Sequence, residues 1–335
     1  MKYITIIFIA VMMILYSCNN AKANTSIKDK NDNINKDNNI NKNFYFNADN
    51  AYNYIKKQTD LGSRNYGSEA HKKVRDFFKK EISNMGYEVF SHNFEAPYIK
   101  GRKGENIYAF LKGKTDDYVI IASHFDSRSV AEKDPMQFNR DKPISGANDG
   151  ASSSGVLMEL MKALKNYNDL PYSICFVLFD LEDDGNLFDV KGSSLIETDW
   201  IQGSIAFVNE IIIRDKLIDK QKIKFGILLD MVGSKTAKFK YESFAHTYYS
   251  AIYNQIWNYA DDLGYGNYFA DGHYGTIIDD HTPFLNESIP FIDIIDMGYP
   301  FHHTSQDTID KLDKKTLEAV GKTIEYSIKN ADKIY

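Results

Sequence analysis

This sequence of 335 residues has few cysteines and no excess of positive charge. The first argues against a fold held by disulfides, and the second against a protein that binds nucleic acid. The two cysteines are Cys18, which ends an apolar N-terminal segment, and Cys175, which lies inside an apolar run. If Cys18 carries a lipid, no intrachain disulfide can form, and Cys175 is expected to be a buried free thiol. The formal charge is −6 and the lysines are scattered, which argues against binding to nucleic acid.

The first apolar run, Ile4–Leu15, is too short for a comfortable transmembrane helix and follows Lys2, as in an export signal. It ends in Leu15-Tyr16-Ser17-Cys18, which resembles the cleavage box of bacterial lipoproteins. Met1–Ser17 is therefore predicted to be a lipoprotein signal peptide. The alternative is a signal peptide that stays uncleaved or is cut elsewhere.

Residues 18–43 are predicted to be a lipidated cysteine followed by a disordered tether. Positions 19–43 are rich in Asn, Lys and Asp and hold no aromatic residue, so they cannot bury enough apolar surface to offset the entropy of ordering. We therefore expect an exported protein that a lipid anchors to a membrane of a bacterial cell envelope, with its folded part in the periplasm or outside the cell.

Residues 44–335 are predicted to form one α/β domain, because apolar strand-like runs alternate with helical periodicity. The expected fold is a three-layer α/β/α sandwich around a mixed, mostly parallel sheet. Two segments, 127–146 and 184–222, lack periodicity and are expected to be insertions at the functional rim. Strands are expected at 87–94, 106–111, 118–122, 173–179, 224–229 and 290–295, and helices at 68–85, 150–166, 244–263 and 314–331.

Polar residues follow several of the apolar strands, at the edge of a parallel sheet where ligands bind. Imidazole and carboxylate together are a common zinc shell. Each residue also has an ordinary explanation as a strand-end cap, a helix cap or a turn former. Their occurrence at successive strand and loop ends favours a metal site, with five candidate ligands: His124, Asp149, Asp183, Asp230 and His303. Asp126, two residues after His124, is expected to orient that imidazole.

Six spaced segments resemble the zinc aminopeptidase family of clan MH, in the family's order. They are HFD at 124–126, GANDGASSSG at 146–155, LEDDG at 181–185, LLDMVG at 228–233, DDHTPF at 279–284 and HHTSQDT at 302–308. The likeness begins near Leu61 and extends to the C-terminal helix. It looks most like the glutaminyl-peptide cyclotransferase branch, particularly bacterial enzymes of animal type. The resemblance implies a zinc-dependent catalytic domain that acts on the N-termini of peptides or proteins.

The resemblance implies two alternative metal sets. A dizinc aminopeptidase would hold one ion with His124 and Asp230, hold the other with Asp183 and His303, and bridge both with Asp149. A cyclase would keep one zinc, on Asp149, Asp183 and His303.

The resemblance also implies the catalytic groups. Glu182 matches the general base, which in a cyclase moves a proton from the substrate's α-amine to the departing ammonia. In that case Asp230 pairs with Asp279, since two close carboxylates can share one proton.

The segments LEDDG, DDHTPF and FIDIID favour a cyclase, which converts N-terminal Gln to pyroglutamate and releases ammonia. Asp293 stands where animal enzymes place a His, and His281 is expected to lie beside Asp279. One residue departs from the pattern: His302 stands where cyclases usually have a Trp that walls the glutamine pocket.

Two other functions stay open. The chain could be a dizinc aminopeptidase that removes N-terminal residues from peptides, since all five ligand positions of that class are filled. A non-catalytic peptide-binding lipoprotein is the third, and the presence of Glu182 with a complete ligand set argues against it.

Overall fold

A six-stranded sheet forms the centre of the computed structural model, with strand order β1-β2-β4-β3-β5-β8. The structure describes residues 43–185 and 198–334, which belong to the unit Asn41–Tyr335. The predicted signal peptide and the tether up to residue 42 lie outside these described residues. The strands are β1 (Phe90–Glu95), β2 (Lys103–Leu111), β3 (Tyr118–His124), β4 (Ser173–Phe179), β5 (Ile223–Asp230) and β8 (Phe291–Ile295), and a separate pair joins β6 (Phe239–Tyr241) to β7 (Phe269–His273).

Four strands of the sheet, β4, β3, β5 and β8, run parallel, whereas β1 and β2 are antiparallel to their neighbours. The predicted mixed, mostly parallel sheet is therefore confirmed. β3 and β4 are buried almost along their whole length, because neighbouring strands and helices cover them. The parallel register brings His124 level with Phe179, so the polar residues that follow both strands meet at one edge.

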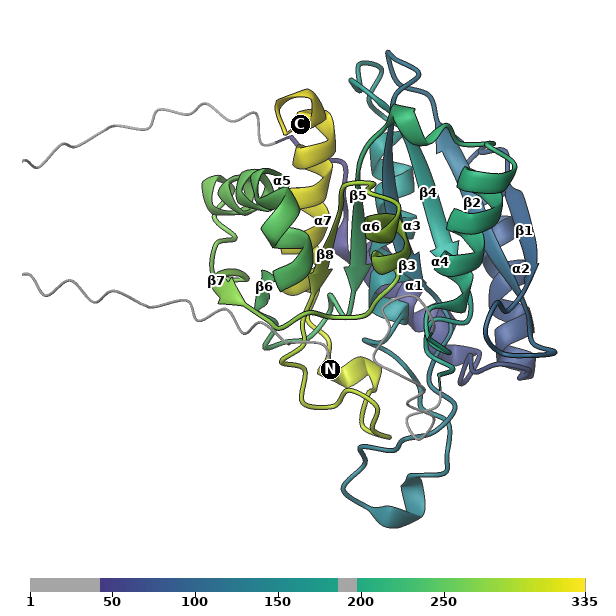
Figure 1. Cartoon of the computed structure of the whole chain (residues 1–335). Helices are drawn as coiled ribbons and strands as arrows, with labels where there is room; N and C mark the ends of the chain where they lie inside the picture. Colours follow the sequence, from purple (N-terminus) through teal and green to yellow (C-terminus); the bar gives the residue numbers. More distant parts are fainter. Residues whose placement is uncertain (1–42, 186–197, 335) are drawn as a thin grey trace, which may run out of the picture. The chain divides into compact units, whose positions relative to one another are not determined.

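Helices lie on both faces of the sheet, as the three-layer prediction requires. In Figure 1, α4 and α6 lie in front of the strands, and α1, α2 and α3 lie behind them. α5 packs against β8 and α7, and α7 packs against α1 and α3. The α-helices are α1 (Ala48–Asp60), α2 (Glu69–Asn84), α3 (Ala151–Leu164), α4 (Gln202–Phe207), α5 (Ser243–Asp262), α6 (Thr282–Asn286) and α7 (Lys314–Lys329).

Most expected elements occur within a few residues of their predicted bounds. α2 begins as expected after Ser68, whose side chain accepts a hydrogen bond from the backbone N–H of His71. Several elements were not predicted. They are α1, α6 and the strand pair β6–β7, and in the rim segment 184–222 they are α4 and the helical turns Val208–Arg214 (η2). Packing against β1 and β2 orders α4, although its short sequence has no helical periodicity.

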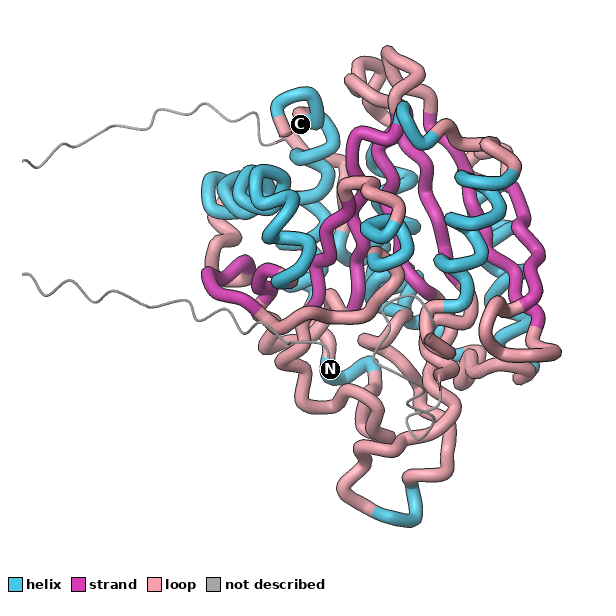
Figure 2. The backbone as a smooth tube through the Cα atoms, in the orientation of Figure 1, coloured by secondary structure: helices cyan, strands magenta, loops and turns pink. Residues whose placement is uncertain are grey.

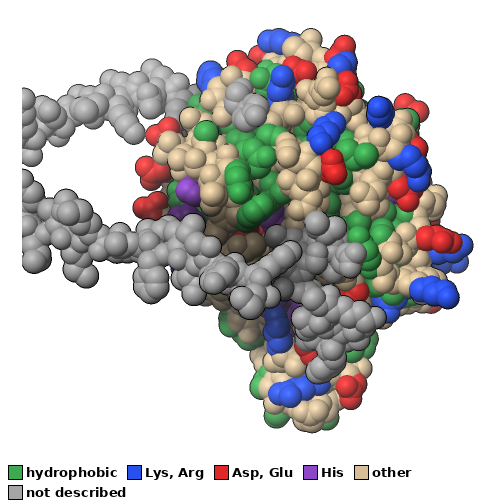
Figure 3. Space-filling model, in the orientation of Figure 1, with side chains coloured by type: hydrophobic (Ala, Val, Ile, Leu, Met, Phe, Trp, Pro, Cys, Tyr) green, Lys and Arg blue, Asp and Glu red, His purple; other side chains and the backbone are tan. Residues whose placement is uncertain are grey.

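The long connections gather beyond the carboxyl ends of the parallel strands (Figure 2). The segment between β3 and α3, which includes the short turn Gln137–Asn139 (η1), extends furthest from the sheet in Figure 1. Cys175 is a buried free thiol, as predicted. On the face drawn in Figure 3, Lys and Arg side chains lie among Asp and Glu rather than in one stripe. No helix in the described part of the chain has the length and apolarity needed to span a bilayer.

Candidate active site

The carboxyl edge of the sheet brings His124, Asp149 and Asp230 into one buried group. His124 Nε2 lies 3.2 Å from Asp149 Oδ1 and 3.1 Å from Asp230 Oδ1. His124 ends β3, Asp230 ends β5, and Asp149 precedes α3. Burial opposes the charged imidazole, but hydrogen bonds to Asp126, Asp149 and Asp230 together raise the pKa of His124 well above its usual value.

A second group forms on the other side of Asp149. His303 Nε2 lies 3.1 Å from Asp183 Oδ1 and 3.6 Å from Asp149 Oδ2. Asp149 therefore faces His124 with one oxygen and His303 with the other, as expected of a bridging carboxylate. All five predicted ligands are brought together.

The donor set fits a metal ion. Both carboxylate oxygens of Asp183 are buried and accept no hydrogen bond, although His303 Nε2 faces one of them. Buried carboxylate oxygens need a partner, and a divalent cation supplies one. Ligand atoms of His124, Asp149 and Asp230 lie within 4.8 Å of one another, as do those of Asp149, His302 and His303. Imidazole nitrogen and carboxylate oxygen are ligands that zinc accepts.

Unusual backbone conformations aim several of these side chains. Leu181, Met231 and His303 have positive φ angles of 59°, 48° and 54°, respectively, although none of them is glycine. Each lies in a turn at the carboxyl edge and is itself a candidate ligand or stands within two residues of one. A positive φ angle is unfavourable for a residue with a side chain, so the packing around these turns must hold the backbone in this conformation.

Asp126 holds the acidic turn after β4. Its carboxylate accepts hydrogen bonds from the backbone N–H groups of Glu182 and Asp183, both at 3.1 Å. Asp126 also lies next to His124, as the sequence predicted, with its Oδ1 3.5 Å from His124 Nδ1. The shorter contacts show that its main partners are the two amides. Asp126 thereby positions the predicted base and one predicted ligand together.

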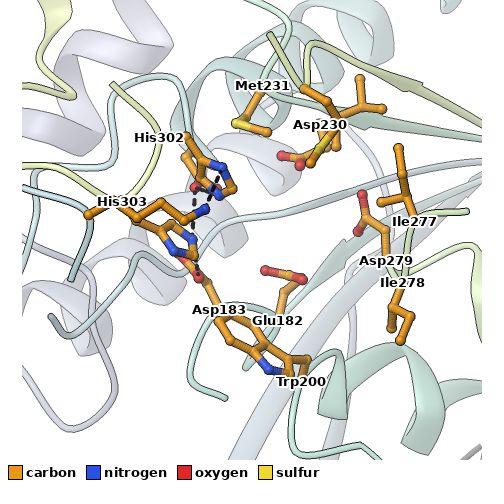
Figure 4. A pocket seen from close by; sticks show the side chains of 14 residues that line it. Glu182, Asp183, Trp200, Asp230, Met231, Ile277, Ile278, Asp279, His302 and His303 are labelled. Carbon is orange, nitrogen blue, oxygen red and sulfur yellow. Dashed lines mark hydrogen bonds and ion pairs between the residues drawn. The ribbon is translucent and has the colours of Figure 1, made fainter. Parts of the chain in front are cut away.

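Glu182 points into a pocket of about 210 Å³ beside the metal-binding groups (Figure 4). Asp230 and Asp279 line the same pocket. Burial, together with the negative charges of Asp183, Asp279 and Asp280, raises the pKa of Glu182 well above its usual value. Burial and the charge of Asp230 likewise raise the pKa of Asp279 well above its usual value, which favours a shared proton.

His302 lies at the pocket wall. Its Nε2 lies 3.6 Å from Asp149 Oδ2, and Lys133 Nζ lies 3.1 Å from its Nδ1. Burial and the neighbouring His303 lower the pKa of His302 to about 3, so its ring is neutral. Both imidazoles reach Asp149, but His303 also reaches Asp183, which favours His303 as the ligand.

His281 and Asp293 do not line the pocket but lie directly behind Asp279. Ligand atoms of these three residues lie within 4.8 Å of one another. His281 Nε2 also lies 3.6 Å from Glu242 Oε2. The predicted place of His281 beside Asp279 therefore agrees with the structure.

Several pocket residues were not predicted from the sequence. Trp200 is one of only two tryptophans in the chain, and its place in the rim segment could have identified it. Its indole stacks on the His303 ring, with centroids 5.9 Å apart and planes inclined by 4°. The other apolar residues of the pocket come from three parts of the chain, two loops and the end of β8 with the residues after it, and gave no signal: Met231, Ile277, Ile278, Ile295 and Met297.

Gly150 allows His124 to approach the start of α3. A Cβ atom at this position would lie 2.4 to 2.7 Å from three atoms of the His124 ring. We expect Gly150→Ala to lower the free energy of unfolding by about 1–3 kcal/mol, the usual cost of overpacking. Urea denaturation measures the change. Gly275→Ala is the matched control, since nothing lies within 4 Å of its added Cβ. Equal stability of both variants would contradict the expectation.

The fold and this donor set define a metal-dependent α/β enzyme of the aminopeptidase type. The chain belongs to peptidase family M28, whose model matches residues 106–328. The predicted family and the prediction of an enzyme are thereby confirmed.

The chain is also similar to solved structures and to a curated relative that are glutaminyl cyclases or zinc-dependent exopeptidases. Porphyromonas gingivalis glutaminyl cyclase is 32% identical with a TM-score of 0.78, over 86% of this chain and 100% of that one. A Zn-dependent exopeptidase from Parabacteroides distasonis is 30% identical with a TM-score of 0.77, over 85% of this chain and 98% of that one. The glutaminyl-peptide cyclotransferase of Gloydius blomhoffii is 24% identical over 77% of this chain and 75% of its own.

Proposed function

We propose that this protein is a zinc-dependent glutaminyl-peptide cyclotransferase, which converts the N-terminal Gln of peptides to pyroglutamate and releases ammonia. The observation that carries the proposal is Glu182, a half-buried carboxylate that faces the pocket between the His303–Asp183 pair and Asp279. Similarity to cyclases of two kinds, bacterial and animal, supports it. Incubation with a peptide bearing N-terminal Gln tests it, because a cyclase releases ammonia without adding water and leaves the chain at full length.

The reaction forms a bond from the α-amine nitrogen of the substrate to its side-chain amide carbon and breaks the bond from that carbon to the amide nitrogen. Zinc bound to Asp149, Asp183 and His303 would polarise the amide carbonyl. Glu182 accepts a proton from the attacking amine and gives it to the departing nitrogen, so ammonia leaves and the base is regenerated. Asp230 and Asp279, sharing a proton, orient the amine.

The pocket wall fits a small amide side chain. His302 is neutral and smaller than the Trp that cyclases usually carry at this position, while Trp200 supplies an aromatic wall from another loop. A Gln side chain would lie between Trp200 and the apolar residues Ile277 and Ile295. The replaced Trp therefore leaves the pocket wider but still apolar on two sides.

The second candidate function is a dizinc aminopeptidase, favoured by the close group of His124, Asp149 and Asp230. We expect His124→Gln, which keeps an amide donor for the two carboxylates, to leave turnover within a few-fold and one zinc per chain. Atomic absorption on the purified variant measures the metal. A fall from two zinc ions to one, together with loss of activity, would favour the aminopeptidase instead.

The pH dependence of the reaction follows from Glu182. A base acts when deprotonated, so kcat/KM should rise with pH through the pKa of Glu182, which lies well above its usual value. Asp280 raises that pKa and does not line the pocket. In Asp280→Asn, the loss of this charge should move the acidic limb of the kcat/KM profile to lower pH. A shift to higher pH would contradict the assignment of Glu182 as base.

We also propose that the enzyme works in the cell envelope on peptide or protein N-termini, held to a membrane by a lipid on Cys18. The proposal rests on the leader sequence alone, Met1–Ser17 followed by Cys18. Mass spectrometry of the mature N-terminus tests it, and an unmodified Cys18 or a different cleavage point would contradict it.

A further inference from the structure

Arg128, Glu132, His303 and Trp200 form a closed ring of contacts around one side of the metal-binding group. The Glu132 carboxylate lies 2.5 Å from Nδ1 of His303, the ring nitrogen opposite the one that faces Asp183. Arg128 Nε donates to both oxygens of Glu132, at 3.3 and 3.2 Å. The Arg128 guanidinium also lies 4.3 Å from the centroid of the Trp200 ring, which stacks on His303.

The same guanidinium reaches the second predicted ligand. Arg128 donates from one terminal nitrogen to the backbone carbonyl oxygens of Asp183, at 3.0 Å, and Gly185, at 2.6 Å. Arg128 is only 2% exposed, so these bonds are formed away from bulk water. One side chain thus fixes Asp183 directly and His303 through Glu132.

We propose that Glu132, held by Arg128, is a positioning residue that prepares His303 for the metal. A carboxylate accepts only, so His303 donates from Nδ1 to Glu132, and a metal ion at the site would take the Nε2 lone pair in place of a proton. Carboxylates that orient ligand imidazoles in this way typically change metal affinity by about 10- to 100-fold. Trp200 stacks on the His303 ring. Glu132 and Arg128, by holding that ring, therefore also fix one wall of the substrate pocket relative to the metal.

The test measures zinc affinity of the full-length protein by competition with a chromophoric chelator. Glu132→Ala should weaken zinc binding by about 10- to 100-fold. Glu132→Gln should weaken it less, because its amide oxygen still accepts from Nδ1 but no longer pairs with Arg128. Asp141→Ala is the matched control: it removes the same charge from an exposed position in the same connection between β3 and α3, and zinc affinity should not change.

Nitrogen NMR of the His303 ring, assigned with His303→Gln, supplies a readout that a merely structural role would not move. In the zinc-bound wild type, the proton on Nδ1 should give a downfield-shifted signal because of its short bond to Glu132, and Glu132→Ala should lose that shift. Zinc affinity of Glu132→Ala within twofold of wild type would overturn the proposal, as would equal weakening in Asp141→Ala. If Glu132→Ala does not fold, an unchanged affinity of Glu132→Gln, with an unchanged signal of the Nδ1 proton, overturns it.

Arg128→Lys tests whether Arg128 acts on His303 through Glu132. Lys keeps the charge but loses the forked donors and the stacking on Trp200. If Arg128 acts through Glu132, the loss in zinc affinity for the double variant should be smaller than the combined losses of the two single variants. Strict additivity would overturn the linkage. Zinc binding is measured without substrate, so this proposal and the proposed cyclase activity can fail separately.

Discussion

Replacement of Glu182 by Gln is expected to lower kcat by about 10²- to 10⁴-fold, the usual contribution of a general acid–base group. Gln has the same size but cannot accept a proton from the substrate amine. Zinc content should stay unchanged, because Glu182 is not one of the proposed ligands, and the hydrogen bond from its backbone N–H to Asp126 does not depend on the side chain. Steady-state kinetics and metal analysis of the purified variant measure both.

Glu95→Gln is the matched control for this variant, since Glu95 lies on the exposed end of β1 and pairs only with Lys103 among the described residues. It should retain full activity. Near-normal turnover of Glu182→Gln would remove Glu182 from its role as base. Loss of zinc in Glu182→Gln would show instead that this carboxylate holds the metal.

Replacement of His303 by Ala should remove zinc and activity together. His303 is the imidazole that reaches both Asp149 and Asp183, and its removal leaves two buried carboxylates facing each other without a cation between them. Positioning carboxylates alone account for about 10- to 100-fold in affinity, so loss of a ligand itself should exceed 100-fold. Chelator competition measures the affinity, and turnover is followed at the same zinc concentrations.

His273→Ala serves as the control, because His273 is exposed and, within the described part of the chain, contacts His246 and Tyr241 away from the pocket. Retention of zinc by His303→Ala would show that His302 takes over at Asp149, which its distance of 3.6 Å would permit. In that case the ligand set would be revised to include His302. The double variant His302→Ala/His303→Ala would then be expected to lose the metal.

The elements and ligands that the sequence predicted are those with strong local signals. Apolar runs identified β3, β4 and β5. β3 and β5 end in His124 and Asp230, and Asp183 follows four residues after the end of β4. His124, Asp183 and Asp230 could be named in advance because parallel strands end at a common edge. His303 could be named only from its motif, since it lies on a loop.

The residues that the sequence did not predict depend on tertiary contacts. Glu132 comes from an extended connection without periodicity, and only the fold brings it to His303 across 171 positions. Trp200 and the other apolar pocket residues likewise come from separate parts of the chain. α4 is too short to show a helical repeat and is ordered by packing against the sheet. Asp126 was assigned to His124 because of spacing, whereas its shortest bonds lead to the turn after β4.

The most direct test of the account is incubation of the zinc-loaded protein with a peptide bearing N-terminal Gln, followed by mass spectrometry. The account predicts loss of ammonia from an otherwise intact peptide, abolished in Glu182→Gln. That result would also show that His302 can replace the pocket Trp of related cyclases. Release of the free N-terminal residue, leaving a shortened peptide, would contradict the account and identify an aminopeptidase that uses the same site.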